Sequence, residues 1–294
     1  MDALGYYIFY PFYRLVNLLP LRILYVLSDF LYLILYYFPS YRRKVVETNL
    51  KNAFPEKSDK DLKCIEKKFY KHLADMFIET FKAGFLSRKE LEKRFTVSGA
   101  EIVNKLYDEK RDIIAVLGHY NNWEMALLLA EKIKPKPFVI YKPLQNKYFD
   151  RLINNQRTKH GMGITAMSMV IKVILQSRKD KINTISMILS DQTPPKNEIQ
   201  YWTNFLNQDT PVYTGVEKIA RKYDMAVVYF HIRKIKRGYY RLEIEKLVDN
   251  PKDMAENMIT EAHVRRLEEI IREKPEYWTW SHRRWKHKKP PENG

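Results

Sequence analysis

The chain has 294 residues, of which 45% are hydrophobic and 14% aromatic, and this composition excludes a disordered protein and allows one large core. Its single cysteine, Cys64, excludes an internal disulfide and a cysteine-rich zinc site. Lys and Arg number 52 against 35 Asp and Glu, and the resulting net charge of +17 predicts an anionic partner: nucleic acid, an acidic carrier protein or anionic lipid headgroups.

The N-terminal stretch is apolar and rich in Tyr and Phe. Between residues 3 and 41 it carries only three charged side chains, Arg14, Arg22 and Asp29. We predict that residues 1–41 form a membrane anchor and residues 42–294 a second domain. A signal peptide is not expected, because no charged region precedes the apolar run and no small-residue cleavage site follows it.

The way in which this anchor meets the membrane stays open. The stretch after Arg22 is about long enough to span a bilayer, but Asp29 interrupts it, so an in-plane helix fits as well as a spanning one. The basic residues 42–44 then predict that the rest of the chain stays on the cytoplasmic side. The alternative is that these helices simply pack on the following domain.

The next elements form a scaffold and lead to one reactive side chain. Ser58 and Asp61 have the spacing of a capping box, which predicts a long helix up to Gly84. Residues 112–117 are an unbroken β-prone run, as in a buried strand. Gly118 ends that run and His119 follows it, at the strand end where open α/β sheets place their ligands.

His119 and Glu124 form a candidate pair around a corner. We predict a helix that begins at Asn121, with Glu124 in its first turn. From there Glu124 either caps the helix, or reaches back to orient the imidazole and stabilise its protonated form. The pair alone favours the capping role.

The remaining elements complete an α/β pattern. Strands are predicted at 138–141 and 184–189, a hairpin at 226–235 and 239–248, and helices at 146–160, 213–222 and 251–273. This order predicts a mostly parallel sheet flanked by helices. Asp191 follows the strand at 184–189; it either reaches the edge that carries His119 or closes the strand in an Asx turn.

The C-terminal end, W-T-W-S-H-R-R-W-K-H-K-K, interleaves tryptophans with cations. This pattern suits single-stranded nucleic acid and a lipid headgroup interface equally well, and the apolar N-terminus favours lipid and argues against nucleic acid. The sequence contains no phosphate-binding glycine loop, dinucleotide fingerprint or metal-ligand histidine cluster. We therefore expect neither a metal nor a bound cofactor.

Several stretches together resemble one family, the lipid A late (secondary) acyltransferases of the lysophospholipid acyltransferase superfamily. G-H-Y-N-N-W-E resembles the family's H-x4-E/D box, with Glu124 in the acid position. Four further stretches match in order: N-L-K-N-A-F-P-E at 49–56, Y-K-P-L-Q-N-K-Y-F-D-R-L-I-N-N-Q-R at 141–157, S-D-Q-T-P at 190–194 and P-E-Y-W-T-W-S-H-R-R-W-K at 275–286. The chain departs from the family at 205–215, where F-F-G is frequent.

The resemblance implies transfer of a fatty acyl group from a thioester, usually on acyl carrier protein and otherwise on CoA, to a hydroxyl of a lipid acceptor at the cytoplasmic face of the inner membrane. It makes His119 the general base and Glu124 the acid that holds it, with no metal or cofactor. The residues expected to contact substrate are Arg157, Asp191, Gln192 and Asn122, and Arg157 or amides near Asn121 are the candidate donors to an oxyanion. Two alternatives stay open: a different acceptor, such as a lysophospholipid or an aminolipid, and a non-enzymatic basic protein that coats membranes or nucleic acid.

Overall fold

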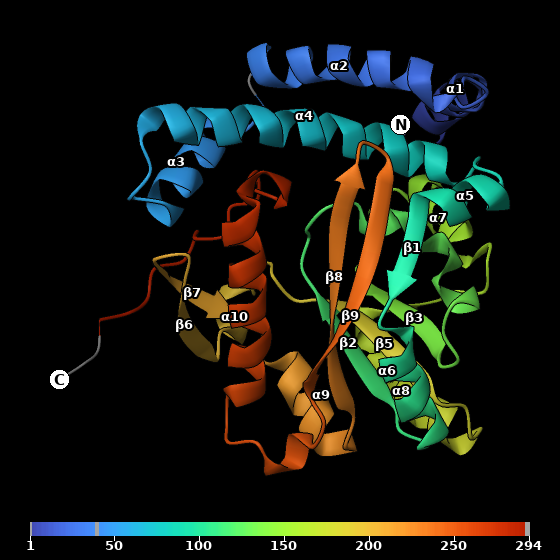
Figure 1. The fold of residues 1–294 in the computed structure, drawn as a ribbon, viewed down its shortest axis with the longest axis vertical. Coiled ribbons are helices and arrows are strands. Elements are labelled where there is room, and N and C mark those ends of the chain that lie inside the picture. Colours follow the sequence, from blue (N-terminus) through green and yellow to red (C-terminus); the bar gives the residue numbers. More distant parts are fainter. Residues whose placement is uncertain (1, 39–40, 292–294) are drawn as a thin grey trace.

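A seven-stranded sheet forms the centre of the protein (Figure 1). The computed structural model describes residues 2–38 and 41–291, so residues 1, 39 and 40 of the predicted anchor lie outside the described residues. The strand order is β1-β9-β8-β2-β5-β3-β4, and every neighbouring pair is parallel except the hairpin of β8 and β9. The predicted mostly parallel sheet with flanking helices is confirmed.

The elements of the described chain have the following bounds. The strands are β1 Phe95–Ser98, β2 Ile113–Leu117, β3 Lys136–Tyr141, β4 Gly163–Ala166, β5 Thr184–Leu189, β8 Ala226–Lys236 and β9 Tyr239–Val248, with a separate antiparallel pair β6 Tyr201–Phe205 and β7 Gln208–Val212. The α-helices are α1 Asp2–Val16, α2 Leu21–Tyr37, α3 Arg43–Ala53, α4 Asp59–Ala83, α5 Arg88–Arg94, α6 Ala100–Asp108, α7 Lys147–Thr158, α8 Val170–Lys179, α9 Gly215–Tyr223 and α10 Met258–Glu273. The 3₁₀ segments are η1 Trp123–Glu131, η2 Met167–Met169, η3 Lys196–Glu198, η4 Pro251–Asp253 and η5 Pro275–Tyr277.

The central strand β2 is buried along its whole length. Its side chains alternate between two cores, as the period of a strand requires. Ile114 and Val116 pack in the core that contains Leu267 of α10, whereas Ala115 and Leu117 face the core that contains Leu128 of η1. Burial on both faces explains why the sequence of this strand is continuously apolar.

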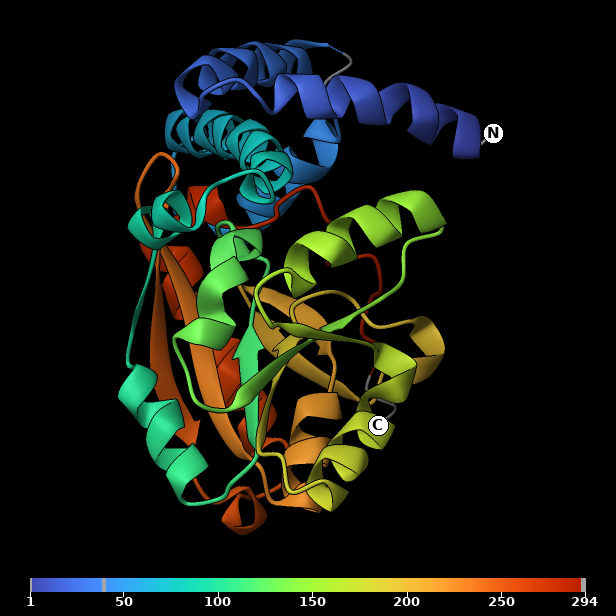
Figure 2. The same ribbon diagram turned by 90° about the vertical axis from the view of Figure 1, so that its right-hand side faces the viewer.

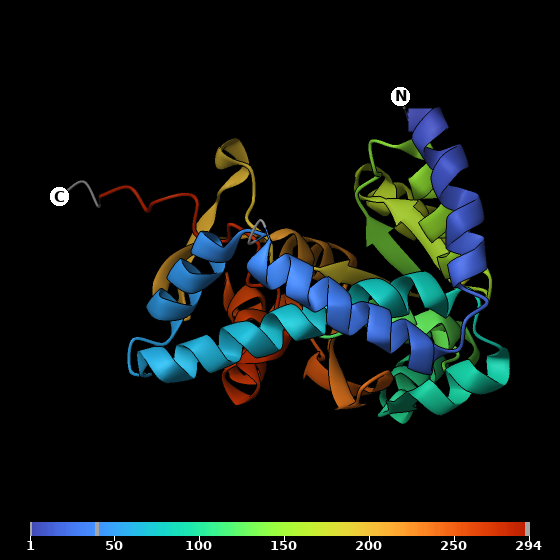
Figure 3. The ribbon, with the colours of Figure 1, turned by 90° about the horizontal axis from the view of Figure 1, so that it is seen from above.

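The N-terminal helices lie together at one end of the molecule. α4 crosses the end of the sheet toward which β8 points, and α2 runs along α4 on its outer side (Figure 1), while α1 diverges from both (Figures 2 and 3). Ser58 caps α4 by accepting a hydrogen bond from the amide of Asp61, as predicted. Ser28 of α2 donates to Asp75 of α4 at 2.7 Å, so α2 is fixed on the scaffold by a polar contact.

The outer surface of α1 and α2 is apolar. Among the described residues, no helix combines the length and the apolar content that crossing a bilayer requires. Asp29, which interrupts the apolar sequence, forms an ion pair with Arg237 at the tip of the β8–β9 hairpin. Among the side chains of α1, α2 and the turn between them whose burial the structure describes, the exposed large apolar ones are Tyr7, Phe12, Leu15, Leu18, Leu19, Ile23, Val26, Leu27, Phe30, Leu33, Ile34 and Tyr37.

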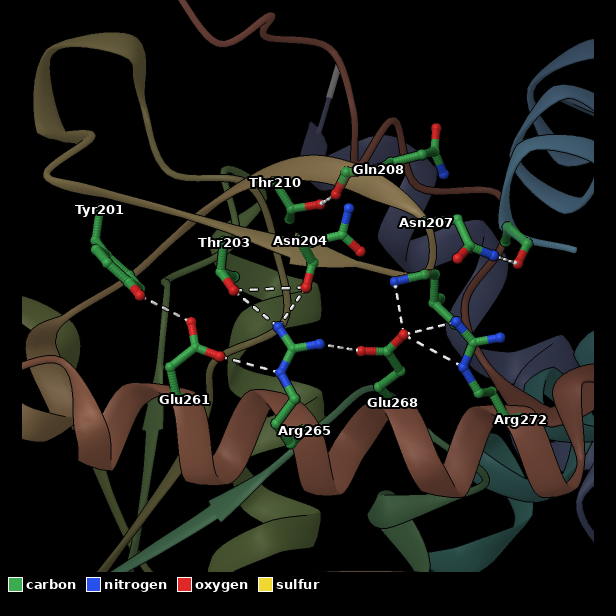
Figure 4. A network of polar contacts seen from close by, with 12 residues as sticks. Tyr201, Thr203, Asn204, Asn207, Gln208, Thr210, Glu261, Arg265, Glu268 and Arg272 are labelled. Atoms are coloured by element: carbon green, nitrogen blue, oxygen red, sulfur yellow. Dashed lines mark hydrogen bonds and ion pairs between the residues drawn. The ribbon is translucent and has the colours of Figure 1, made fainter. Parts of the chain in front are cut away.

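The short hairpin β6–β7 is fastened to α10 (Figure 4). Arg265 of α10 donates to Thr203 of β6, and Glu268 accepts from the amide of Leu206 at the turn between the strands. This hairpin covers part of the 205–215 stretch in which the chain departs from the F-F-G pattern. A polar attachment to α10 therefore sets the position of that stretch.

Three local predictions are wrong. The segment after His119 is not an α-helix that begins at Asn121, because Asn121 has a left-handed φ of 55° and the 3₁₀ segment η1 follows. The helix predicted over 251–273 begins at Met258, after η4. The expectation that the C-terminal tryptophans serve a lipid headgroup interface fails for Trp278 and Trp280, which are fully buried.

Candidate active site

The register of the sheet brings two polar residues together. Leu117 at the end of β2 pairs with Leu189 at the end of β5, and the amide of Ser190 donates to the carbonyl of Leu117 at 3.2 Å. His119 and Asp191 each lie two residues beyond their paired leucines. Parallel strands end at the same edge, so these two side chains emerge next to each other.

The side chains of His119 and Asp191 are in direct contact. Nδ1 of His119 lies 2.6 Å from Oδ1 of Asp191, and the backbone amide of His119 donates to Oδ2 at 2.9 Å. Gly118 permits this approach, because a Cβ atom at that position would lie 2.7 Å from Leu267 and 3.4 Å from Oδ2 of Asp191. The carboxylate therefore holds both the ring and the backbone of His119.

Asp191 is buried yet ionised. Burial alone would raise its pKa, but the imidazole of His119, the hydrogen bonds from the ring and the backbone amide of that residue, and the indole N–H of Trp278 at 2.8 Å outweigh burial and hold the pKa of Asp191 at about 2. An ionised carboxylate accepts hydrogen bonds only. In neutral His119 the proton therefore belongs on Nδ1, and Nε2 carries the free lone pair.

Nε2 of His119 lies next to the exposed side chain of Gln192. The amide of Gln192, an exposed side chain, lies 3.3 Å from Nε2 of His119. On another side the indole of Trp123 meets the imidazole edge to face, with ring centres 4.9 Å apart. His119 keeps 20% of its side chain exposed, so a substrate hydroxyl can approach Nε2.

Glu124 does not contact His119, contrary to the predicted pairing. Its carboxylate accepts from Nε of Arg157 at 3.0 Å, from Nη2 of Arg157, and from the indole N–H of Trp123 at 3.2 Å. The two side chains of this ion pair are only 15–16% exposed. Glu124 thus binds Arg157 and Trp123, and Trp123 in turn packs against the imidazole of His119.

The two asparagines after His119 are internal. The Asn121 side chain donates to the carbonyl of Ile232 at 2.8 Å, and its backbone amide donates to the carbonyl of Tyr277. Asn122 has no exposed surface and donates to buried Glu79 at 3.0 Å. Asn122 was expected to contact substrate; the structure instead gives it a partner inside the protein, and Asn121 is not the predicted helix cap.

A possible metal site lies elsewhere. Within the described residues, the group with suitable ligand atoms is His231, Glu243 and Glu245 on β8 and β9, and it includes neither His119 nor Asp191. Arg233 pairs with Glu243, and Arg266 pairs with Glu245 through two contacts of 2.6 Å. These arginines already neutralise the two carboxylates, which makes the group a poor site for a dication.

The local sequence around Trp278 did not predict that this side chain would reach Asp191. Its tryptophan-rich surroundings suggested an interface with lipid, whereas its indole N–H bonds to Asp191. An isolated bridge between Tyr120 and Trp278 attaches this C-terminal segment to the loop after His119. The signal that could have placed this segment at the site was the resemblance: residues 275–286 matched the family pattern together with the H-x4-E/D box.

The chain is similar to known proteins along most of its length. Residues 1–287 match the family described as bacterial lipid A biosynthesis acyltransferase. The chain belongs to this family. It is 24% identical to the lipid A biosynthesis lauroyltransferase of Escherichia coli (strain K12) over 275 residues, which cover 92% of this chain and 88% of that protein. It is also 20% identical to the lipid A biosynthesis acyltransferase 2 of Shigella flexneri over 239 residues, or 81% and 76% of the two chains.

Membership of the family decides the class of activity. The protein is an O-acyltransferase, as predicted, and the alternative of a non-enzymatic basic coat protein is set aside. Acyl transfer to a hydroxyl needs a base for the hydroxyl proton and donors for an oxyanion. The edge of the sheet around His119 offers both kinds of group.

Proposed function

We propose that this enzyme transfers a fatty acyl group from a thioester donor to a hydroxyl of a lipid A precursor, with His119 as general base and Asp191 as the acid that orients it. The observation that carries the proposal is the 2.6 Å contact between Nδ1 of His119 and the buried carboxylate of Asp191. This contact leaves Nε2 free to accept a proton. The assignment replaces Glu124 by Asp191 as the partner of the histidine.

The reaction proceeds through a tetrahedral intermediate. Nε2 of His119 takes the proton of the acceptor hydroxyl while the hydroxyl oxygen attacks the thioester carbonyl. The carbon–sulfur bond then breaks, the acyl group stays on the acceptor oxygen, and the protonated His119 returns its proton to the departing thiolate. Asp191 stabilises the imidazolium between these two steps, because its charge lies against Nδ1.

The oxyanion of the intermediate needs nearby donors. The exposed amide of Gln192 lies 3.3 Å from Nε2 of His119, and we assign it this role. Arg157 is held by Glu124 through Nε and Nη2, which leaves Nη1 to face an anionic group of a substrate. The Glu124–Arg157 pair then serves substrate binding and the placement of Trp123, and does not serve proton transfer.

The donor and the location belong to the same proposal. A net charge of +17 suits an acidic acyl carrier protein as donor and an anionic lipid as acceptor. The exposed apolar surface of α1 and α2 supports contact with the cytoplasmic face of the inner membrane, with residues 1–41 as an in-plane anchor. Asp29 does not oppose this orientation, because it pairs with Arg237.

The experiment that tests the proposal is reconstitution. The full chain in lipid nanodiscs is incubated with a lipid A precursor and either acyl carrier protein or CoA loaded with the same acyl chain. Mass spectrometry should show a gain of one acyl chain on the precursor, with faster transfer from the carrier protein, and no gain with His119→Ala. Acylation of an added lysophospholipid in place of the precursor would overturn the proposed acceptor.

A further inference from the structure

Asp191 receives a hydrogen bond from a third source besides the ring and the backbone of His119. The indole N–H of Trp278, a side chain 1% exposed, donates to Oδ2 of Asp191 at 2.8 Å. Within the part of the chain that the structure describes, it is the one donor to this carboxylate from outside His119. Trp278 therefore decides how the carboxylate is turned toward the imidazole.

A buried cation stands near the same carboxylate. Arg284 is 2% exposed, and together with Asp191 it lines a small cavity between the loop at 190–193 and α10. Nη1 of Arg284 donates to the hydroxyl of Thr193 at 3.4 Å, and among the described residues its Nε has no hydrogen-bond partner. Burial lowers the pKa of Arg284 to about 10, so the guanidinium stays charged at neutral pH.

The other titratable groups around Asp191 are neutral at pH 7. Burial holds the pKa of His263, on α10, and of His282, in the C-terminal segment, at about 4, and it raises the pKa of Tyr229, on β8, well above 10. Arg284 is thus the permanent counter-charge of Asp191 while His119 is neutral. A buried carboxylate without a counter-charge would be strongly unfavourable.

The segment that carries these two side chains also holds the loop after Asp191. The hydroxyl of Thr193 donates to the backbone carbonyl of Arg284, and the amide of Thr193 donates to Nε2 of His282 at 3.3 Å. Asn49 of α3 also binds the segment, because its side-chain amide donates to the carbonyls of Trp280 and His282. Loop and segment therefore form one packed unit.

The ring of Trp278 is itself fixed by aromatic neighbours. It packs edge to face on Trp280, with centres 4.8 Å apart, and on Phe205 of β6 at 5.8 Å. Phe205 lies on the hairpin that Arg265 and Glu268 attach to α10 (Figure 4). A rotation of Trp278 would disturb all of these contacts. The packing around the ring therefore fixes the direction of its N–H toward Asp191.

We infer that Trp278 and Arg284 are positioning residues for the reaction: Trp278 orients the Asp191 carboxylate toward His119, and Arg284 balances its charge. The inference rests on the proposed function, in which Asp191 holds the general base. It assigns to Trp278 and Arg284, two side chains of the C-terminal segment, a role that both exert through Asp191. Without Arg284, the uncompensated charge of Asp191 would favour protonated His119, which cannot accept the substrate proton.

The first test compares two tryptophans of equal burial in the full chain. Trp278→Phe removes the N–H that reaches Asp191, whereas Trp280→Phe removes an N–H that donates to the carbonyl of Pro275. Each variant keeps an aromatic ring in the core. We expect Trp278→Phe to lower kcat about tenfold or more with little change in KM, and Trp280→Phe to keep kcat within about twofold. Equal kcat values in the two variants would overturn the role of Trp278.

The second test uses the charge of Arg284. In Arg284→Gln, the acidic limb of the kcat/KM profile against pH should move to higher pH. Without the cation, the negative charge of Asp191 stabilises protonated His119 more strongly, so a higher pH is needed to deprotonate it. Arg284→Lys keeps a cation and should restore most of the wild-type profile. A limb that does not move in Arg284→Gln would overturn the role of Arg284, and a change in folding alone would not produce a shift.

A readout independent of turnover separates this inference from the proposed function. In the full chain labelled at histidine Cε1, the NMR titration midpoint of the His119 ring should move upward in Arg284→Gln and stay unchanged in Trp280→Phe. His119→Gln assigns the signal. If the wild type transfers no acyl group, the proposed function fails, while the titration still reports whether Arg284 acts on His119. If transfer occurs and the midpoint does not move, only the present inference fails.

Discussion

Nδ1 of His119 lies 2.6 Å from Oδ1 of Asp191, a residue 72 positions further along the chain. The H-x4-E/D box places an acid five residues from the histidine, yet that acid, Glu124, is bonded to Arg157. The box therefore supplies two separate devices. The first is His119, whose carboxylate partner, Asp191, follows the neighbouring strand β5. The second is the ion pair between Glu124 and Arg157.

The first prediction concerns the role of Asp191. Asp191→Asn keeps the size of the side chain but removes the charge that fixes the proton on Nδ1 of His119 and stabilises the imidazolium. We expect acyl transfer to fall about 10³ to 10⁴-fold, by analogy with other histidines oriented by a buried aspartate. The measurement is kcat with saturating donor. Asp209→Asn, an exposed change on β7, is the control and should leave kcat unchanged.

The second prediction concerns His119 itself. Removal of a general base typically costs about 10² to 10⁴-fold in rate, so His119→Ala should nearly abolish transfer. The thermal unfolding temperature should stay close to that of the wild type, because the ring is partly exposed and Asp191 keeps its bond from Trp278. A variant that still turns over at more than a tenth of the wild-type rate would show that another group takes the hydroxyl proton.

The third prediction separates Glu124 from Asp191. Glu124→Gln leaves the largely buried charge of Arg157 without its counter-ion and should lower the free energy of unfolding by roughly 2 kcal/mol, measured by denaturant titration. Turnover should also fall, but the pH profile should keep its acidic limb in place, because Glu124 does not touch the imidazole. A shifted limb would restore Glu124 as the acid that holds His119.

Arg157 offers a complementary change. Arg157→Lys keeps the positive charge but loses the planar fork that binds Glu124 through two nitrogens, and it should impair turnover as well. The double variant Glu124→Gln with Arg157→Lys should lose less stability than the sum of the two single changes, since both remove the same ion pair. Additive losses would show that the pair contributes little.

The fourth prediction concerns the apolar surface of α2. Val26 and Phe30 are 67% and 62% exposed. Val26→Glu with Phe30→Glu should release most of the protein from sedimented vesicles that contain anionic lipid, because these charges oppose insertion of the helix face. Leu175→Glu, a change at a 49% exposed side chain of α8, is the matched control. Equal sedimentation of both variants and the wild type would contradict the anchor.

The fifth prediction concerns acid stability. Burial holds the pKa of His231, His263 and His282 at about 4 in the folded protein, whereas an unfolded histidine titrates near about 6.5. The unfolded chain binds more protons between these values, so stability is retained above about pH 6.5 and is lost as the pH falls toward 4. For fully buried His263 the loss amounts to about 3 kcal/mol. Denaturant titrations in detergent at pH 7 and pH 4.5 should differ less for His263→Leu than for the wild type.

The sequence alone determined the features that depend on neighbouring residues. The buried run of β2, the Ser58 cap and the position of His119 after β2 all follow from the local apolar pattern and from short-range hydrogen bonding, which local sequence encodes. The H-x4-E/D box and the matching stretches also pointed to the family before any fold was known. The prediction of a helix that begins at Asn121 failed because a tertiary contact competes with the local pattern. The Asn121 side chain donates to the carbonyl of Ile232, and the residue takes a left-handed backbone conformation.

The tertiary structure alone decided which residues meet at the site. Asp191 reaches His119 because Leu117 pairs with Leu189, and a shift of one residue in that register would turn the carboxylate to the opposite face of the sheet. Trp278 reaches Asp191 across 87 residues, since packing on Phe205 and Trp280 buries a segment that the sequence presents as a surface pattern. Register and packing between distant segments depend on the whole core, and so the partner of His119 could not be read from the spacing of residues near it.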